Sequence, residues 1–147
     1  MTLESRRLYR DAPIPWFREL RSADAEECLA AGLMPMQAVY GSVKGSTEAF
    51  VILDGDLPLA FWGYAAQSTL GSACQAWLLT TPLVEKYKVF FARESLKKFH
   101  WLVRLYPFIS VTVDVKHLVA RNWLEWLGFE EVSRHGRFIV MFARGVR

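Results

Sequence analysis

The sequence has few cysteines and histidines, and neither kind of residue is spaced to hold a metal. Cys28 and Cys74 are the two cysteines, and they stand far apart in apolar surroundings. The three histidines, His100, His117 and His135, form no cluster with them. Because structural metal sites draw on closely spaced Cys and His ligands, we expect no metal. We expect both cysteines to be buried thiols in a reducing cytosol.

Long apolar runs are also missing. The longest uncharged stretch, residues 57–84, is interrupted by Pro58, Gly63 and several Gln, Ser and Thr residues. It therefore lacks the ~20 mostly apolar residues of a membrane-spanning helix. Residues 1–11 contain three arginines but no apolar run behind them, which argues against a secretory signal peptide. We expect a protein of the cytoplasm rather than a secreted one.

No block of like charge stands out either. The net charge is +3, but the 18 Lys and Arg residues are dispersed among 15 Asp and Glu residues. Nucleic-acid binding is therefore permitted but not indicated. A length of 147 residues with 52% apolar residues fits one folded domain and excludes disorder. We predict a single domain over residues 1–147, with residues 1–12 as a flexible or loosely attached arm.

The first half of the chain predicts a strand, two helices and three further strands. Ser22 is expected to cap the first helix, with Asp24 in its first turn and Gly32 at its end. Asp54 and Gly55 predict a tight turn between two strands. The expected elements are residues 14–20, 22–32, 36–42, 49–53, 57–64 and 75–80.

The second half predicts a long helix, a strand, a short helix and a final hairpin. A capping hydroxyl of Thr80 or Thr81, followed by Pro82, is typical of a helix start. Gly128 is expected to end the short helix. The elements are residues 83–104, 108–115, 117–127, 129–133 and 138–143. The order β α α β β β α β α β β predicts an α/β fold with a mixed sheet and crossover helices.

Residues 113–132 resemble the C-terminal signature of the GNAT acyl-CoA N-acyltransferases, which have the same order of elements. Ala120 and the pair Gly128 and Phe129 match that signature. The resemblance implies a GNAT-like mixed β-sheet with crossover helices. It also implies acetyl-CoA or another acyl-CoA as cofactor and an amine as substrate, with the strand amide after Trp77 polarising the thioester carbonyl.

The segment that would hold the cofactor departs from the GNAT pattern. The superfamily has a glycine-rich loop at this place, whereas residues 80–88 contain no glycine. The amides of residues 84–87 are candidates for a phosphate site, because a helix N-terminus binds anions, but Glu85 opposes this. The alternative is an ordinary capped helix start. The cofactor-binding residues implied by the resemblance are Trp77, Leu79, Thr80, Thr81, Val84, Lys86, Tyr87, Lys88 and Asn122.

The catalytic positions depart from the pattern too. The usual general acid of the superfamily is a tyrosine, and Leu124 stands at that position. Leu124 can neither donate nor accept a proton. His117 falls where the superfamily has an asparagine, and with Asp114 it is the candidate for acid–base chemistry. An ordinary helix cap or surface residue is the alternative for His117.

Three further segments, residues 31–38, 59–63 and 77–81, resemble the podovirus internal virion (core) protein A group and related phage proteins. That resemblance implies a place in the host cytoplasm or the virion, and a virion or host protein as partner. Two functions therefore stay open. One is an acyl-CoA-dependent N-acyltransferase acting on an amine of a protein or small molecule. The other is a non-catalytic, virion-associated or host-interacting binding protein on a degenerate GNAT scaffold.

The chain is rich in aromatic residues, with six Trp among them. Trp62, Trp77 and Trp101 fall on faces that we expect to pack in the core. The same expectation covers Trp123 and Trp126. The alternative is that Trp123 and Trp126, together with Phe129, contribute to a partner surface, because exposed aromatic clusters often anchor interfaces.

Overall fold

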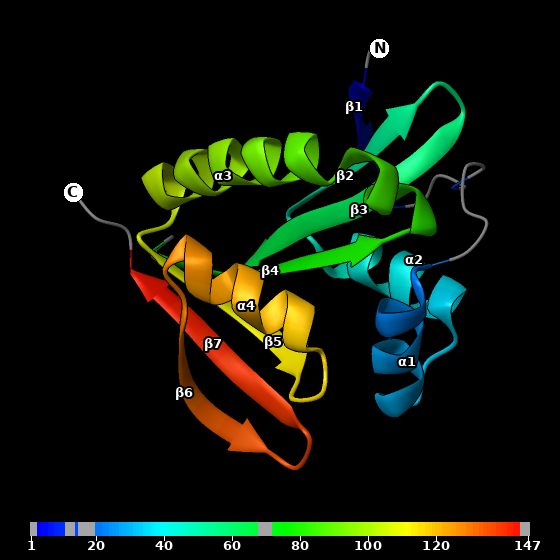
Figure 1. The fold of residues 1–147 in the computed structure, drawn as a ribbon. Coiled ribbons are helices and arrows are strands. Elements are labelled where there is room, and N and C mark those ends of the chain that lie inside the picture. The colour runs from blue at the N-terminus through cyan, green and yellow to red at the C-terminus, as the bar shows by residue number, and fades with distance from the viewer. Residues whose placement is uncertain (1–2, 11–13, 15–19, 68–71, 145–147) are drawn as a thin grey trace. The chain divides into compact units, whose positions relative to one another are not determined.

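The computed structural model describes residues 3–10, 14, 20–67 and 72–144. Figure 1 shows the helices and strands in the predicted order. They are β1 (Leu3–Leu8), α1 (Ser22–Ala30), α2 (Pro35–Gly45), β2 (Glu48–Asp54), β3 (Leu57–Ala66), β4 (Ala73–Thr80), the 3-10 helix η1 (Pro82–Tyr87), α3 (Lys88–Leu105), β5 (Phe108–Asp114), α4 (Leu118–Leu127), β6 (Glu130–His135) and β7 (Phe138–Arg144).

Hydrogen bonds join the seven described strands in the order β1-β2-β3-β4-β5-β7-β6. The pairs β1–β2, β2–β3, β5–β7 and β6–β7 are antiparallel, and β4–β5 is parallel. The predicted class, an α/β fold with a mixed sheet, is confirmed. Contacts divide the chain into two compact units, Met1–Ala65 with Trp77–Lys88, and Ala66–Ala76 with Val89–Arg147. The single domain over residues 1–147 stays a prediction.

In the first unit, the strand at the edge of the sheet differs from the expectation of a flexible arm over residues 1–12. Residues 3–8 form β1, which pairs with β2 from Leu3 opposite Asp54 to Leu8 opposite Ala49. Of this strand only Leu8 is buried. Backbone pairing with β2, rather than an apolar face, holds this strand in the sheet. Its sequence therefore lacks the alternation of apolar and polar residues that would have predicted a strand. The predicted strand at residues 14–20 lies largely outside the described residues.

The hairpin of β2 and β3 follows the prediction closely. Its two-residue loop is Gly55 and Asp56, one position later than the predicted turn, and Gly55 has φ +61°. A positive φ at the first loop position suits glycine, as in type II′ turns. Helix α1 begins at Ser22, but its N-cap is Arg21 and no side chain caps it. The prediction that Ser22 is the cap is therefore wrong by one residue.

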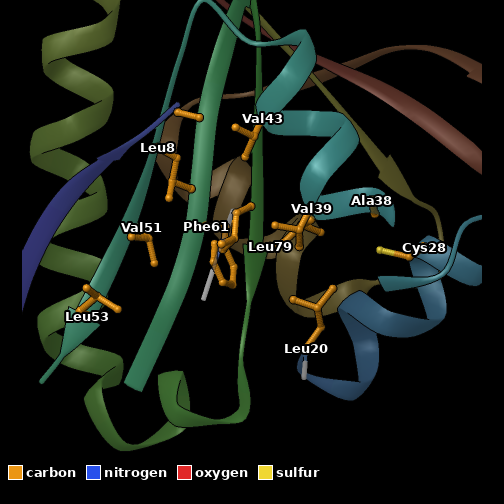
Figure 2. Close-up of a cluster of buried hydrophobic side chains, with 12 residues drawn as sticks. Leu8, Leu20, Cys28, Ala38, Val39, Val43, Val51, Leu53, Phe61 and Leu79 are labelled. Carbon is orange, nitrogen blue, oxygen red and sulfur yellow. The ribbon is translucent and has the colours of Figure 1, made fainter. Parts of the chain in front are cut away.

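The core of the first unit lies between its strands and helices α1 and α2. Figure 2 shows its side chains pointing toward one another from β1, β2, β3, β4, α1 and α2. Cys28 belongs to this cluster, and burial raises the pKa of its thiol to about 11. Cys74 is also fully buried, and burial raises its pKa to about 12. Both cysteines are free, buried thiols, as expected.

The second unit contains β5, β6, β7, α4 and all but the first residue of α3. Gly128 ends α4 in the left-handed conformation with φ +107°, which confirms the predicted stop. Phe129 is buried and lies against Phe99 of α3, with ring centroids 5.4 Å apart. The predicted long helix is divided, because residues 82–87 form the 3-10 turn η1 before α3 begins.

The aromatic residues divide between core and surface in an unexpected way. Trp101 is 41% exposed and Trp126 is 59% exposed, so the prediction that they pack in the core is wrong. Phe129, the alternative surface residue, is 4% exposed and belongs to the core. Among the described residues, no helix is both long enough and apolar enough to cross a membrane.

Gly63 of β3 is a position where a side chain has no room. A methyl group there would lie 2.6 Å from the carbonyl oxygen of Glu48 and 2.9 Å from Nε1 of Trp77. We predict that Gly63→Ala lowers the free energy of unfolding by about 1–3 kcal/mol, because the core must shift to admit it. Urea-induced unfolding measures this change.

Gly41→Ala is the matched control, since nothing lies within 4 Å of the added methyl group in α2. It should be neutral or stabilise the protein by about 0.5–1 kcal/mol through helix propensity. Equal destabilisation by both substitutions would contradict the contact at Gly63.

Candidate functional site

The edge of β4 that faces away from β3, over the residues of β4 that belong to the first unit (Trp77–Thr80), is the first part of the candidate site. The β4–β5 ladder has three residue pairs and ends at Gln75 and Ser110, whereas β4 continues to Thr80. The Thr81 amide donates to the Leu59 carbonyl of β3, with N and O 3.1 Å apart. Because successive peptide groups of a strand point to opposite edges, those of Leu78 and Thr80 point away from β3.

Helix α1 occupies this edge at Thr80. The Thr80 carbonyl accepts from the Arg21 amide at 2.7 Å, and the Thr80 amide donates to Oδ2 of Asp24 at 2.7 Å. The Thr80 hydroxyl donates to the same carboxylate oxygen. Asp24 is 6% exposed and Thr80 is 7% exposed. On the edge of β4 that faces away from β3, residues of the α1 start thus bind the peptide groups of Thr80. They do not bind the peptide groups of Leu78.

The turn after β4 is a capped helix start, the alternative to a phosphate site. The Thr81 hydroxyl donates to the Pro58 carbonyl at 2.6 Å and accepts from the Leu83 amide at 3.3 Å. The Val84 amide donates to the Thr81 carbonyl at 3.1 Å. The first amides of the turn are thus bonded inside the protein. The side chains of Val84 and Tyr87 are buried, and the Tyr87 hydroxyl donates to Asp54.

The charges at this turn are already partly paired. A carboxylate oxygen of Glu85 lies 2.7 Å from Nη2 of Arg21, and the other lies 2.9 Å from Nζ of Lys88. The hydrogen bond from Lys88 lowers the pKa of Glu85, which is therefore an anion at neutral pH. Lys86 lies over the ring of Tyr87, with Nζ 5.5 Å from the centroid. Of the two lysines expected to assist a phosphate, Lys88 already has an anionic partner.

Asp114, a candidate for acid–base chemistry, lies at the end of β5 in the second unit. It is 2% exposed, and its Oδ2 lies 2.6 Å from Nη2 of Arg137. Its Oδ1 accepts from the Lys116 amide at 3.0 Å. Burial raises the pKa of Asp114, but the hydrogen bonds from Arg137 and the Lys116 amide outweigh it, so the pKa is lowered. The carboxylate is a weak base held in an ion pair.

His117 is the N-cap of α4, which is the alternative considered for it. Its Nδ1 accepts from the Ala120 amide at 3.3 Å, and its own amide donates to the Asp114 carbonyl at 2.9 Å. The residue is 8% exposed. A neutral imidazole with an accepting Nδ1 bears its proton on Nε2. The structure therefore brings His117 and Asp114 together at one corner, where both stabilise the start of α4.

The remaining candidates differ in exposure. Trp77 is half-buried and donates from Nε1 to the Ser46 hydroxyl at 2.7 Å, whereas Leu79 is buried in the core. Asn122 lies exposed on α4. Leu124 is 3% exposed and packs in the interior. No group of three or more His, Cys, Asp or Glu in the described part of the chain is arranged to hold a metal ion.

Sequence reasoning missed the part that Arg21 and Asp24 take in this region. Asp24 was expected only to favour the helix dipole, and its bonds to Thr80 join residues 56 positions apart. Its one local signal is its place in the first turn of α1, where a carboxylate is favoured in any case. The sequence does not distinguish an aspartate that only interacts with the helix dipole from one that also forms hydrogen bonds with a distant strand.

Comparisons with known proteins show which solved structures share this fold. No family model matches the sequence, and no curated protein sequence matches it. Solved structures do match. The GNAT domain of PAT from S. lividans superposes with a TM-score of 0.70 at 10% identity, covering 98% of this chain and 91% of that chain.

Two more solved structures agree. Mutant forms of the spermidine/spermine N-acetyltransferase SpeG from Vibrio cholerae give a TM-score of 0.57 at 14% identity, covering 97% of this chain and 95% of that chain. The yncA protein of Salmonella typhimurium, solved with its cofactor acetyl-CoA, gives a TM-score of 0.52 at 12% identity, covering 66% of this chain and 64% of that chain. At these identities the likeness shows the fold alone.

The ion pair of Asp114 with Arg137 leads to a pH-dependent prediction. The pKa of Asp114 is lowered from 3.8, so its contribution to stability is present above that pH and is lost as the pH falls through the lower folded value. We predict that Arg137→Gln lowers the free energy of unfolding by about 1–3 kcal/mol near neutral pH, because it leaves a buried carboxylate without this partner. The difference in the free energy of unfolding between the variant and the parent should become smaller in acid, because protonation of Asp114 removes the ion pair from the parent as well.

Urea unfolding near neutral pH and at about pH 3, below the model-peptide pKa of aspartate, measures both values. Arg134→Gln is the matched control, because its ion pair with Glu131 is solvent-exposed. That variant should lose about 0–1 kcal/mol. A loss for Arg137→Gln that is the same at both pH values would contradict the assignment.

Proposed function

We propose that this protein is an acyl-CoA-dependent N-acyltransferase that binds its acyl donor along the edge of β4 that faces away from β3, at Leu78. The observation that carries the proposal is that the peptide groups of Leu78 point away from β3, beyond the end of the β4–β5 ladder. Such a strand edge offers one amide donor and one carbonyl acceptor to the amide-rich arm of an acyl-CoA. The solved GNAT structure that carries acetyl-CoA supports this choice of donor.

In this proposal the Leu78 amide polarises the thioester carbonyl, as a donor in an oxyanion hole does. The substrate amine attacks the carbonyl carbon, the new C–N bond forms and the C–S bond breaks. Coenzyme A leaves as the thiolate, and the proton lost by the amine passes to water. A leucine side chain has no acidic proton, so Leu124 does not protonate the thiolate, which takes its proton from water. We expect the acceptor to be an amine of a protein or a small molecule.

The turn that follows β4 fits the cofactor less well than the strand edge does. Its first amides are bonded to Thr81, and Glu85 places an anion beside Arg21 and Lys88. A pyrophosphate at this place would compete with Glu85 for those two cations. We therefore expect most of the affinity for acyl-CoA to come from its acyl-pantetheine arm. Lys86, an exposed residue of η1, is the cation that we expect to contact the phosphates.

The second candidate is a non-catalytic binding protein on the same scaffold. It is favoured by the structural roles of the two catalytic candidates, because His117 caps α4 and Asp114 pairs with Arg137. In this case the partner is a virion or host protein, and the place is the virion or the host cytoplasm, as the phage resemblance implies. The two candidates can be distinguished by whether acyl-CoA binds.

We predict that acetyl-CoA and free CoA raise the midpoint of thermal unfolding. A ligand at a hundred times its dissociation constant stabilises the folded state by about 2.7 kcal/mol, which is a shift of about 5–10 °C for a domain of this size. Adenosine monophosphate is the control ligand, because it lacks the pantetheine arm. A shift with CoA and none with adenosine monophosphate supports the transferase, and no shift at millimolar ligand contradicts it.

Amide hydrogen exchange locates the binding on the strand. In the free protein, the Leu78 amide should exchange faster than the Leu79 amide, whose N–H points toward β3. Addition of CoA should slow exchange at Leu78 and leave Leu79 unchanged. A thermal shift with no added protection at Leu78 would mean that the ligand binds elsewhere.

A further inference from the structure

Helix α3 concentrates the positive charge of the protein. Its 18 residues include five Lys and Arg and one Glu, a formal charge of +4, against +3 for the whole chain. The remainder of the chain is therefore slightly acidic. Figure 1 shows α3 as one long helix, and five of the 18 Lys and Arg residues of the chain lie on it.

The outward face of α3 is basic along its length. Arg93, Lys97, His100 and Arg104 are all exposed, and their spacing of three and four residues aligns them in one stripe. Leu102, on the opposite side, is 4% exposed. Lys97 is paired with Glu94 at 3.2 Å, whereas Arg93 and Arg104 make no ion pair with any described residue. Two full cations of the stripe thus face solvent.

Large apolar side chains flank the basic stripe. Val89 is 71% exposed, Phe90 is 38%, Trp101 is 41% and Leu105 is 47%. With 1.5 Å per residue, the helix presents this mixed face over ~27 Å. Exposed aromatic and aliphatic side chains beside a row of cations are the pattern of an interfacial helix. This feature is independent of the acyl-CoA site proposed above.

We propose that the outward face of α3 binds an anionic lipid surface as an interfacial helix. The cations complement the negative surface potential of such a bilayer, and each contributes when it lies near the headgroups. Trp101 and the aliphatic side chains enter the boundary between headgroups and acyl chains. A nucleic acid offers phosphates to the cations, but it gives Val89 and Leu105 no apolar environment. The lipid surface satisfies both kinds of side chain.

Vesicle sedimentation with the full chain tests the proposal. The protein should pellet with phosphatidylcholine vesicles that contain phosphatidylglycerol, and it should stay in solution with pure phosphatidylcholine. The triple variant Arg93→Gln, Lys97→Gln, Arg104→Gln should lower the partition coefficient about a hundredfold. The matched triple variant Lys44→Gln, Lys116→Gln, Arg134→Gln makes the same change in net charge on other elements and should pellet like the parent. Circular dichroism checks that both variants are folded.

A second variant tests the contribution of the exposed apolar side chains to membrane binding. Trp101→Gln with Leu105→Gln keeps every charge, and we expect it to weaken binding most clearly at high salt, where the electrostatic part is screened. Failure of the parent to pellet with the anionic vesicles would overturn the proposal, as would equal losses in the two triple variants. Displacement from the vesicles by polyuridylate or polyglutamate at equal charge would also overturn it, because the face would then bind anionic polymers.

Discussion

The buried carboxylate of Asp24 is the contact on which the geometry of the candidate site depends. It accepts from both the amide and the hydroxyl of Thr80, and the neighbouring Arg21 amide donates to the Thr80 carbonyl. A buried carboxylate is stable only when it is well hydrogen-bonded, and its place in the first turn of α1 adds the favourable field of the helix dipole. One residue thus holds the start of α1 to the end of β4.

The rest of the turn follows from that contact. Thr80 is bound at the edge of β4 that faces away from β3, so Thr81 faces β3. There the Thr81 amide donates to the Leu59 carbonyl and the Thr81 hydroxyl donates to the Pro58 carbonyl. The same hydroxyl accepts from the Leu83 amide and so starts η1, which brings Tyr87 to Asp54 and Glu85 to Arg21. Each step is fixed by the one before it. A turn held in this way has little freedom to open its amides to a phosphate.

Local signals predicted a large part of the fold. Gly128 and Gly55 need a positive φ, and they correctly placed the end of α4 and, within one residue, the turn between β2 and β3. The end of α1 near Gly32 was equally readable, since that glycine has φ +82°. These features were predictable because a few neighbouring residues decide them. The order of the elements then identified the mixed α/β class.

What the sequence did not show depends on partners distant in the chain. Strand β1 has no apolar alternation, since its pairing with β2 uses backbone groups that every residue has. Asp114 was correctly placed on β5, whereas Val84 and Lys86 lie in η1 rather than in the long helix. The sequence also did not show that Asp114 pairs with Arg137 or that His117 accepts from the Ala120 amide. The basic stripe on α3 followed from helical spacing within residues 93–104, whereas the exposure of the apolar side chains beside it, such as Trp101 and Leu105, did not.

The departures from the GNAT pattern fall on side chains, and this bears on what chemistry remains. A substitution can remove a tyrosine acid or a glycine-rich loop, but it cannot remove the peptide N–H of Leu78. Losing a general acid slows a reaction by about 10²–10⁴-fold. A single oxyanion-hole donor contributes about 10²–10³-fold, and in the proposed transferase this donor is the Leu78 amide, on a strand that Asp24 binds at Thr80. The acid and the amide are different groups, so a transferase without the acid keeps the contribution of the amide. The proposal therefore implies a slow transferase whose acceptor amine needs little help to lose its proton.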